Sequence, residues 1–136
     1  MPEWSLNFYK RSKDASGKCT IHRSIEGVHF AIYAMDTEDR AVLDEIEGLG
    51  SGYDEITLHI PDFGTCFSYI AQDAFVDRSL VPYDWYKALV LAGVELHGFP
   101  GSYVRRIEAT PAIRDPDPKR AAKHWGIVNK LITTHC

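Results

Sequence analysis

A group of acidic residues beside two glycines is the part of the sequence best suited to moving a proton. Asp44 and Glu47 precede Gly48 and Gly50 at the expected C-terminal end of a helix. The free carbonyl groups at such an end carry partial negative charge, which raises the proton affinity of a nearby carboxylate. Glu47 follows Leu43 by one turn and borders the apolar stripe, whereas Asp44 is expected to point to solvent.

Partial burial would raise the pKa of Glu47 further, towards the range in which a carboxylate acts as general acid and general base near neutral pH. The alternative is a plain surface glutamate before a glycine helix stop, which the residue types alone favour. Glu47 is therefore the catalytic candidate, with its burial as the deciding property.

Other reactive side chains have simpler explanations. Cys66 could serve as a nucleophile with His59 across a hairpin, but a small buried thiol on a strand is the commoner case. The six histidines lack HExxH and HxH spacings and a nearby carboxylate pattern. We therefore expect no metal site and no cofactor.

The overall charge argues against a nucleic-acid or acidic-membrane partner. The chain has 15 basic and 19 acidic side chains, which gives a net charge of −4. Its basic cluster is therefore interpreted as a solvated hairpin loop, and it consists of Lys10, Arg11, Lys13 and Lys18. A small molecule or a protein is the expected partner.

The cysteines indicate a reducing compartment. Cys19, Cys66 and Cys136 are odd in number and have no CxxC spacing, so neither a disulfide framework nor a zinc knuckle is expected. No apolar run reaches the length needed to cross a bilayer, and the first residues have no cleavage-site pattern. We expect a cytoplasmic protein without a membrane segment.

Hydrophobic periodicity predicts the strands that must position these groups. Trp4, Leu6 and Phe8 alternate with polar residues, which is typical of a strand with one buried face. Similar patterns predict short strands at 19–22 and 28–32, and a hairpin from about Tyr53 to about Gln72.

The helices are predicted by capping residues and by spacings of three and four. Asp36 or Thr37 begins a helix on which Val42, Leu43, Ile46 and Leu49 share one face, and Gly48 and Gly50 end it. Further helices are expected at 84–97, at 99–107 and from Pro118 onward. Strands followed by helices are an α+β pattern, and 136 residues with 45% hydrophobic content fit one domain spanning residues 1–136.

Three blocks of the sequence resemble a known family. These are LDEIEG followed by SGY, the strand FSYIA at 67–71, and the helix WYKALVLAGVELHGFPGSYVRRI at 85–107. In order and spacing they are similar to consecutive blocks of the γ-glutamylcyclotransferase family, and the resemblance covers about residues 6–107. It implies a small, mostly antiparallel, partly closed β-barrel of about five strands with helices packed against it.

The resemblance also implies a reaction and its residues. Glu47 takes the place of the family's catalytic acid and base, and Tyr53, Tyr69 and Tyr86 fall where family members place tyrosines around the substrate pocket. The family converts a γ-glutamyl amide to 5-oxoproline and a free amine or amino acid, without a metal. The sequence does not choose among dipeptide, glutathione and polyamine leaving groups.

One family feature is missing. The Y-G-S-N-type loop that follows the family's first strand, and forms an anion nest for the substrate, occurs nowhere in the 136 residues. We expect either an N-terminally truncated sequence or a shortened relative with altered function. The alternative to an enzyme is a non-catalytic remnant that binds a small ligand or a second copy, since an exposed N-terminal strand edge favours homodimers.

Overall fold

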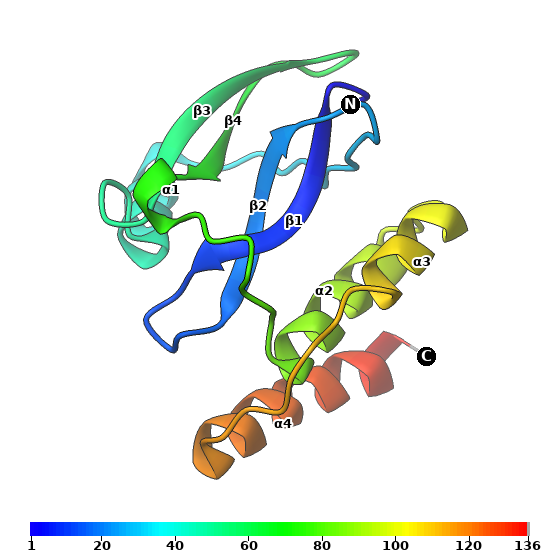
Figure 1. Cartoon of the computed structure of the whole chain (residues 1–136). Coiled ribbons are helices and arrows are strands. Elements are labelled where there is room, and N and C mark those ends of the chain that lie inside the picture. Colours follow the sequence, from blue (N-terminus) through cyan, green and yellow to red (C-terminus); the bar gives the residue numbers. More distant parts are fainter. Residues whose placement is uncertain (136) are drawn as a thin grey trace. The chain divides into compact units, whose positions relative to one another are not determined.

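The computed structural model describes the backbone of residues 1–135 and the side chains of residues 1–131, and Cys136 lies outside the described residues. The chain divides into two compact units, residues 1–80 and 81–136. Strands and one α-helix make up the first unit, and the second contains α-helices (Figure 1). No helix within residues 1–135 combines the length and the apolar character needed to span a membrane. The α+β prediction is confirmed, and the single-domain prediction stays a prediction.

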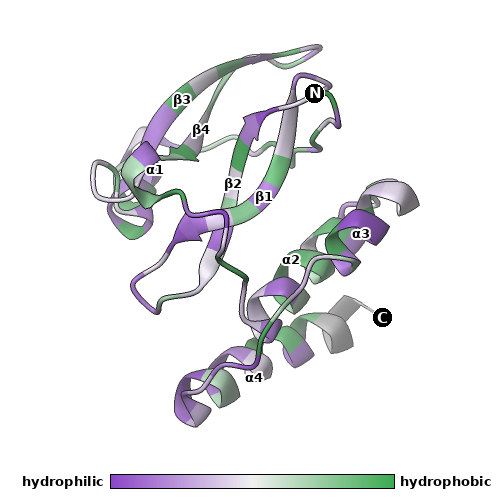
Figure 2. Cartoon of the chain, in the orientation of Figure 1, coloured by the Kyte–Doolittle hydropathy of each residue, from purple (hydrophilic) through white to green (hydrophobic). Residues whose placement is uncertain are grey.

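The first sheet pairs β1 (Trp4–Arg11) with β2 (Gly17–Arg23) in antiparallel orientation, as predicted for 4–9 and 19–22. Hydrophobic residues form green bands along both strands in Figure 2. The register is irregular between Asn7 and Lys10. A Cβ on Gly17 would lie 2.0 Å from the carbonyl oxygen of Phe8, so only glycine fits this close approach.

The second sheet is the predicted hairpin, β3 (Tyr53–Ile60) and β4 (Gly64–Ala71). It is joined to the first sheet by side-chain contacts with β2. The Ala71 N–H donates to the Thr20 hydroxyl at 2.8 Å, and the Tyr53 hydroxyl donates to the Cys19 carbonyl at 2.7 Å. A 3-10 turn, η1 (Asp73–Phe75), follows β4.

The predicted strand at 28–32 does not form, and the predicted barrel is not confirmed. The described strands form two separate two-stranded sheets. Val28 exchanges backbone hydrogen bonds with Met1, at 3.0 and 2.6 Å. Within the described part of the chain, the backbone of Phe30, Ala31 and Ile32 pairs with no strand. The alternating pattern is present in the sequence, but a strand also needs a partner for its backbone groups.

Helix α1 (Thr37–Glu47) forms where predicted, and most of its apolar face is exposed. Val42, Ile46 and Leu49 are 56%, 74% and 41% exposed. The helix instead contacts the β3–β4 hairpin through polar side chains. Arg40 forms an ion pair with Glu55 on β3 and lies 4.0 Å from the ring centroid of Phe67 on β4, and Asp44 accepts a hydrogen bond from Tyr69.

In the second unit, α2 (Asp84–Leu96) contacts both α3 (Gly101–Glu108) and α4 (Pro118–His135). These helices confirm the three predicted from spacing and from Pro118. Buried side chains occur on all three helices, at Trp85, Val94, Tyr103, Ile107 and Val128.

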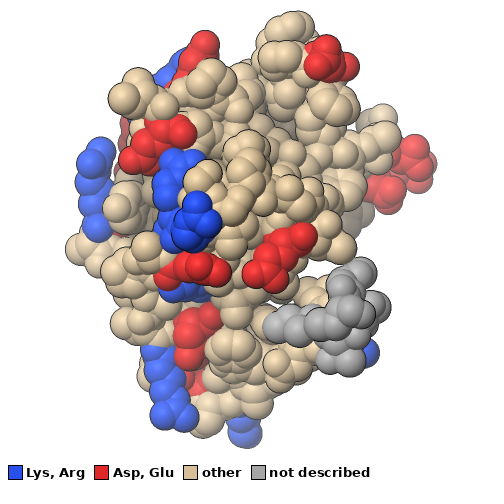
Figure 3. Space-filling view, turned by 90° about the vertical axis from the view of Figure 1, so that its right-hand side faces the viewer, with Lys and Arg blue, Asp and Glu red and all other residues tan. Residues whose placement is uncertain are grey.

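On the face in Figure 3, acidic and basic side chains are interspersed, which agrees with the small net charge of −4.

A buried carboxylate, Asp115, connects α2 with the start of α4. Its side chain is 0% exposed and pairs with both sides of the Arg120 guanidinium, at 2.7 and 2.6 Å. The Trp85 indole N–H and the Asp117 backbone N–H donate to it at 2.9 Å each. The Arg120 hydrogen bonds are the largest cause that holds the pKa of Asp115 well below its usual range.

We expect Asp115→Asn to lower the thermal unfolding midpoint at neutral pH, because an amide cannot accept from all these donors and removes the negative charge that pairs with Arg120. A lowered pKa means that the carboxylate stabilises the fold above the unfolded pKa of about 4 and ceases to do so as pH falls below it. The difference from the native chain should therefore shrink in acid. Circular dichroism melts measure it, with the exposed Glu95→Gln as control; equal melts for the two variants would contradict the prediction.

Candidate active site

Glu47 is the last residue of α1, as the sequence predicted. Gly48 follows it with φ of 70°, a left-handed conformation that glycine adopts without strain. The Gly48 N–H donates to the Glu45 carbonyl at 3.1 Å and the Leu49 N–H to the Asp44 carbonyl at 2.9 Å. The last turn contains no basic residue, so nothing in the helix itself offsets the negative end at Glu47.

The Glu47 side chain is partly buried. Burial raises its pKa above the usual glutamate value, and the nearby charge of Lys10 acts in the opposite direction. Among the groups that the structure describes, none forms a hydrogen bond or ion pair with this carboxylate. Glu47 therefore combines partial desolvation with free acceptor capacity, as a proton-transferring group requires.

Lys10 on β1 faces the same site. Its ammonium lies 4.6 Å from the ring centroid of Tyr53 and 5.9 Å from that of Phe75. A Cβ on Gly52 would lie 3.0 Å from both Cε and Nζ of Lys10, so the glycine leaves the space that this side chain occupies. Gly52 also has φ of 137°, which side chains rarely tolerate.

The loop between α1 and β3 is fastened to the end of β4 by Gln72. The Gly52 N–H donates to the Gln72 side-chain oxygen at 3.0 Å, and the Gln72 N–H donates to the Gly52 carbonyl at 2.8 Å. The Gln72 amide nitrogen donates to Asp54 at 2.9 Å. These bonds fix the backbone beneath Lys10.

Tyr53 and Tyr69, two of the three predicted pocket tyrosines, lie near each other in the first unit, with ring centroids 6.4 Å apart. Tyr53 is buried, and burial raises the pKa of its hydroxyl, which donates to the Cys19 carbonyl. Burial, followed by the hydrogen bond to Asp44, also raises the pKa of Tyr69. Both hydroxyls thus donate within the protein, and the Tyr53 ring presents its face to Lys10.

Two sequence-based interpretations are corrected here. Asp44 does not point to solvent, because Tyr69 on β4 reaches it once the polar side of α1 packs on the hairpin. Cys66 pairs with Leu58 and His59 with Thr65, so Cys66 and His59 lie on opposite faces of the sheet and cannot act together. Among the described residues, no three histidines, cysteines or carboxylates gather in a way that would hold a metal.

Tyr86, the third predicted pocket tyrosine, lies on α2 in the second unit. Its ring packs edge to face against Trp85, with centroids 5.9 Å apart. Its role in the substrate pocket stays a prediction.

Lys10 and Gln72 were not predicted as site residues. For Lys10 the alternation of Trp4, Leu6 and Phe8 predicts the wrong face, because the register irregularity between Asn7 and Lys10 turns its side chain to the face of Ser5 and Asn7. A partly buried lysine is unusual and marks a functional candidate, but this burial is visible only in the structure. For Gln72, which follows the last strand residue, the sequence contains no signal either.

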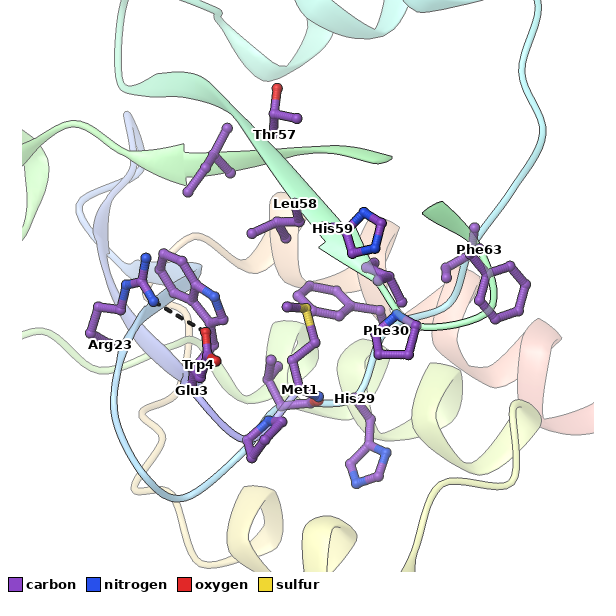
Figure 4. Close-up of a pocket in the computed structure, with 16 residues that line it drawn as sticks. Met1, Glu3, Trp4, Arg23, His29, Phe30, Thr57, Leu58, His59 and Phe63 are labelled. Atoms are coloured by element: carbon purple, nitrogen blue, oxygen red, sulfur yellow. Dashed lines mark hydrogen bonds and ion pairs between the residues drawn. The ribbon is translucent and has the colours of Figure 1, made fainter. Parts of the chain in front are cut away.

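Two cavities lie in the first unit, beside segment 28–35. The larger cavity has a volume of about 770 Å³ and is lined by Met1, Trp4 and Phe30 and by residues 56–60, the second half of β3. The Arg23–Glu3 ion pair lies at its rim (Figure 4). The second, of about 480 Å³, extends from Phe30 to Tyr69 and to Arg40 of α1. Glu47 and Lys10 line neither cavity. Tyr69 lines the second cavity, and the charge of Glu47 is one of the causes that raise the pKa of its hydroxyl.

Two solved structures share this fold. One is an uncharacterized protein from Homo sapiens, with 24% identity and a TM-score of 0.72 over 95% of this chain and 80% of that chain. The other is a γ-glutamyl cyclotransferase, with 22% identity and a TM-score of 0.72 over 96% of this chain and 81% of that chain. No protein-family model and no curated protein matches the sequence. The chain therefore has the γ-glutamyl cyclotransferase-like fold, which confirms the resemblance at the level of fold.

The environment of Glu47 leads to a stability prediction. A raised folded-state pKa means that the ionised carboxylate is disfavoured in the folded chain, by a penalty that is absent below the unfolded pKa and develops as pH rises through the folded pKa. Glu47→Gln should therefore raise the melting midpoint at neutral pH by about 1–2 °C, corresponding to a few tenths of a kcal/mol.

The gain should vanish as pH falls below about 4, where the Glu47 carboxyl is protonated in both the folded and the unfolded chain and is as neutral as the glutamine amide. Glu45→Gln, at an exposed position of the same helix end, is the matched control for the helix dipole alone. Equal shifts for the two variants at neutral pH would show that burial of Glu47 contributes nothing.

Proposed function

We propose that this protein is a γ-glutamyl cyclotransferase-type enzyme in which Glu47 is the general acid and base. The observation that carries the proposal is the partly buried, hydrogen-bond-free carboxylate of Glu47, with its raised pKa, at the negative end of α1. The fold shared with a γ-glutamyl cyclotransferase supports it. The substrate class is a γ-glutamyl amide of an amino acid, a peptide or an amine.

The chemistry requires one group that can both take and return a proton. The α-amine of the substrate attacks its own γ-carbonyl carbon, which forms the ring C–N bond of 5-oxoproline. Glu47 takes a proton from the attacking nitrogen and gives one to the departing nitrogen as the original amide bond breaks. Because the attack is intramolecular, holding the glutamyl chain curled supplies much of the acceleration, and no water enters the balance.

A direct test is release of 5-oxoproline from γ-glutamyl dipeptides and γ-glutamyl amines, measured by chromatography. We expect Glu47→Gln to lower kcat/KM by about 10²–10⁴-fold, because an amide can neither accept nor donate the proton. Glu45→Gln should retain activity, since this exposed neighbour has the same charge and the same helix end. Turnover by Glu47→Gln at the native rate, or a folded native chain without turnover, would refute the proposal.

The second candidate is a non-catalytic protein that binds a second copy of itself. The specific observation is segment 28–35, whose residues Phe30 to Ile32 have an apolar strand pattern and no strand partner among residues 1–135. Ile32 and Tyr33 are 37% and 70% exposed. The edge of β1, which we expected to be the dimer surface, is partly covered by Val28 near its start and by Asp77 near its end. Under this proposal the pairing surface is segment 28–35 instead.

Sedimentation equilibrium tests self-association. Ile32→Lys should weaken a dimer by at least about tenfold, since it replaces an aliphatic side chain that the dimer would bury. Complete burial of such a side chain stabilises by roughly 1.5–3 kcal/mol. The control is Ile25→Lys, at a 96% exposed position just before the segment. A chain that is monomeric at all concentrations, or a dimer that both variants leave intact, excludes this candidate.

A further inference from the structure

Lys10 is a partly buried lysine near the end of β1. The register irregularity between Asn7 and Lys10 turns its side chain to the face of Ser5 and Asn7, opposite to that of Trp4. Ser5 is buried on that face, and so is Thr20 on the paired strand. Burial lowers the pKa of the Lys10 ammonium group, and the charge of Glu47 offsets part of that effect. Partial burial of a lysine has a cost in desolvation.

The surroundings hold the Lys10 ammonium in place without neutralising it. Tyr53 and Phe75 present their rings at 4.6 and 5.9 Å, which favours a cation. Gly52 leaves the space that its Cε and Nζ fill. The Lys10 ammonium forms neither an ion pair nor a hydrogen bond with any group in the described part of the chain. Its three N–H donors are therefore available to an anion from outside the chain.

Glu47 and Lys10 together form an open pair of opposite charges. Lys10 lies on the Tyr53 ring, and the Tyr53 carbonyl accepts from the Gly50 N–H at 2.8 Å, three residues after Glu47. The two groups are therefore near each other, and each charge affects the pKa of the other group. They nevertheless make no direct ion pair, and neither has another hydrogen-bond partner in the described chain. A ligand with a positive and a negative group on one carbon atom would satisfy both side chains at once.

We propose that Lys10 binds the α-carboxylate of the γ-glutamyl substrate while Glu47 faces the α-ammonium group attached to the same carbon. This inference rests on the proposed function and deepens it, because it defines the part of the substrate that is recognised. A γ-glutamyl compound has this zwitterionic head whatever its leaving group. Lys10 is thus a binding and positioning residue, and orients the α-amine towards the γ-carbonyl while Glu47 moves the protons.

The proposal predicts a preference that can be measured by changing one group of the substrate. The pair of probes is L-γ-glutamyl-L-alanine and its analogue in which the glutamyl α-carboxylate is a primary amide. We expect the native chain to prefer the carboxylate form by about 10–100-fold in kcat/KM, as for loss of a charge-assisted hydrogen bond. Lys10→Met should lose most of that preference, because its kcat/KM falls more towards the carboxylate form than towards the amide form.

Two further variants control for charge and for folding. Lys13→Met removes the same charge from an exposed position of the same hairpin and should keep the native preference. Lys10→Arg retains the cation and should keep part of the preference, reduced by the tight space at Gly52. Melting midpoints of all variants establish that they are folded under the assay conditions.

Calorimetric binding of both probes separates this inference from the proposed reaction. If the native chain binds the carboxylate probe more tightly, loses that preference in Lys10→Met and yet turns nothing over, the reaction is refuted and the carboxylate site stands. If turnover falls in Glu47→Gln but the native chain shows no preference, or Lys10→Met keeps it, the Lys10 site is refuted and the reaction stands. Absence of both binding and turnover refutes both.

Discussion

The position of Glu47 depends on how α1 is attached to the β3–β4 hairpin, and that attachment is polar. Arg40 pairs with Glu55 and lies on Phe67, and Asp44 accepts the Tyr69 hydroxyl. Val42 and Ile46 of the helix are exposed, whereas Leu43 lines the second cavity beside the hairpin. Arg40 and Asp44, which lie one turn apart, therefore fix both the rotation of α1 about its axis and the direction of its last residue, Glu47. A helix packed by its apolar face would turn Glu47 elsewhere.

This arrangement places a carboxylate where two effects oppose each other. Burial and the helix end disfavour its charge, and Lys10 favours it. Burial has the larger effect, so the pKa of Glu47 stays above its usual value. Glu47 and Lys10 make no direct ion pair in the described chain. The β1–β2 sheet supplies the lysine, and the loop after α1 supplies the glycine that makes room for it. The two sheets thus contribute to one site through side chains, although their strands do not pair with each other.

Periodicity predicted the elements whose partners lie nearby in the sequence. The β1 and β2 strands, the hairpin and the four α-helices are all local structures, and their patterns were sufficient. Segment 28–32 was predicted as a strand from an equally clear pattern, but pairing is a property of the surroundings. Glu47 could be predicted because a helix end is local. The inward direction of Asp44 and the site position of Lys10 could not be, because both depend on which face of one element meets another.

The cluster around Asp115 has a consequence for how the second unit opens. One carboxylate holds the indole of Trp85 at the start of α2 and the guanidinium of Arg120 in the first turns of α4. If the hydrogen bonds to Asp115 break, α2 and α4 lose these contacts at the same time. Amide protons near the start of α2 and in the first half of α4 would then exchange with solvent at a common free energy, so the two segments would behave as a single cooperative block.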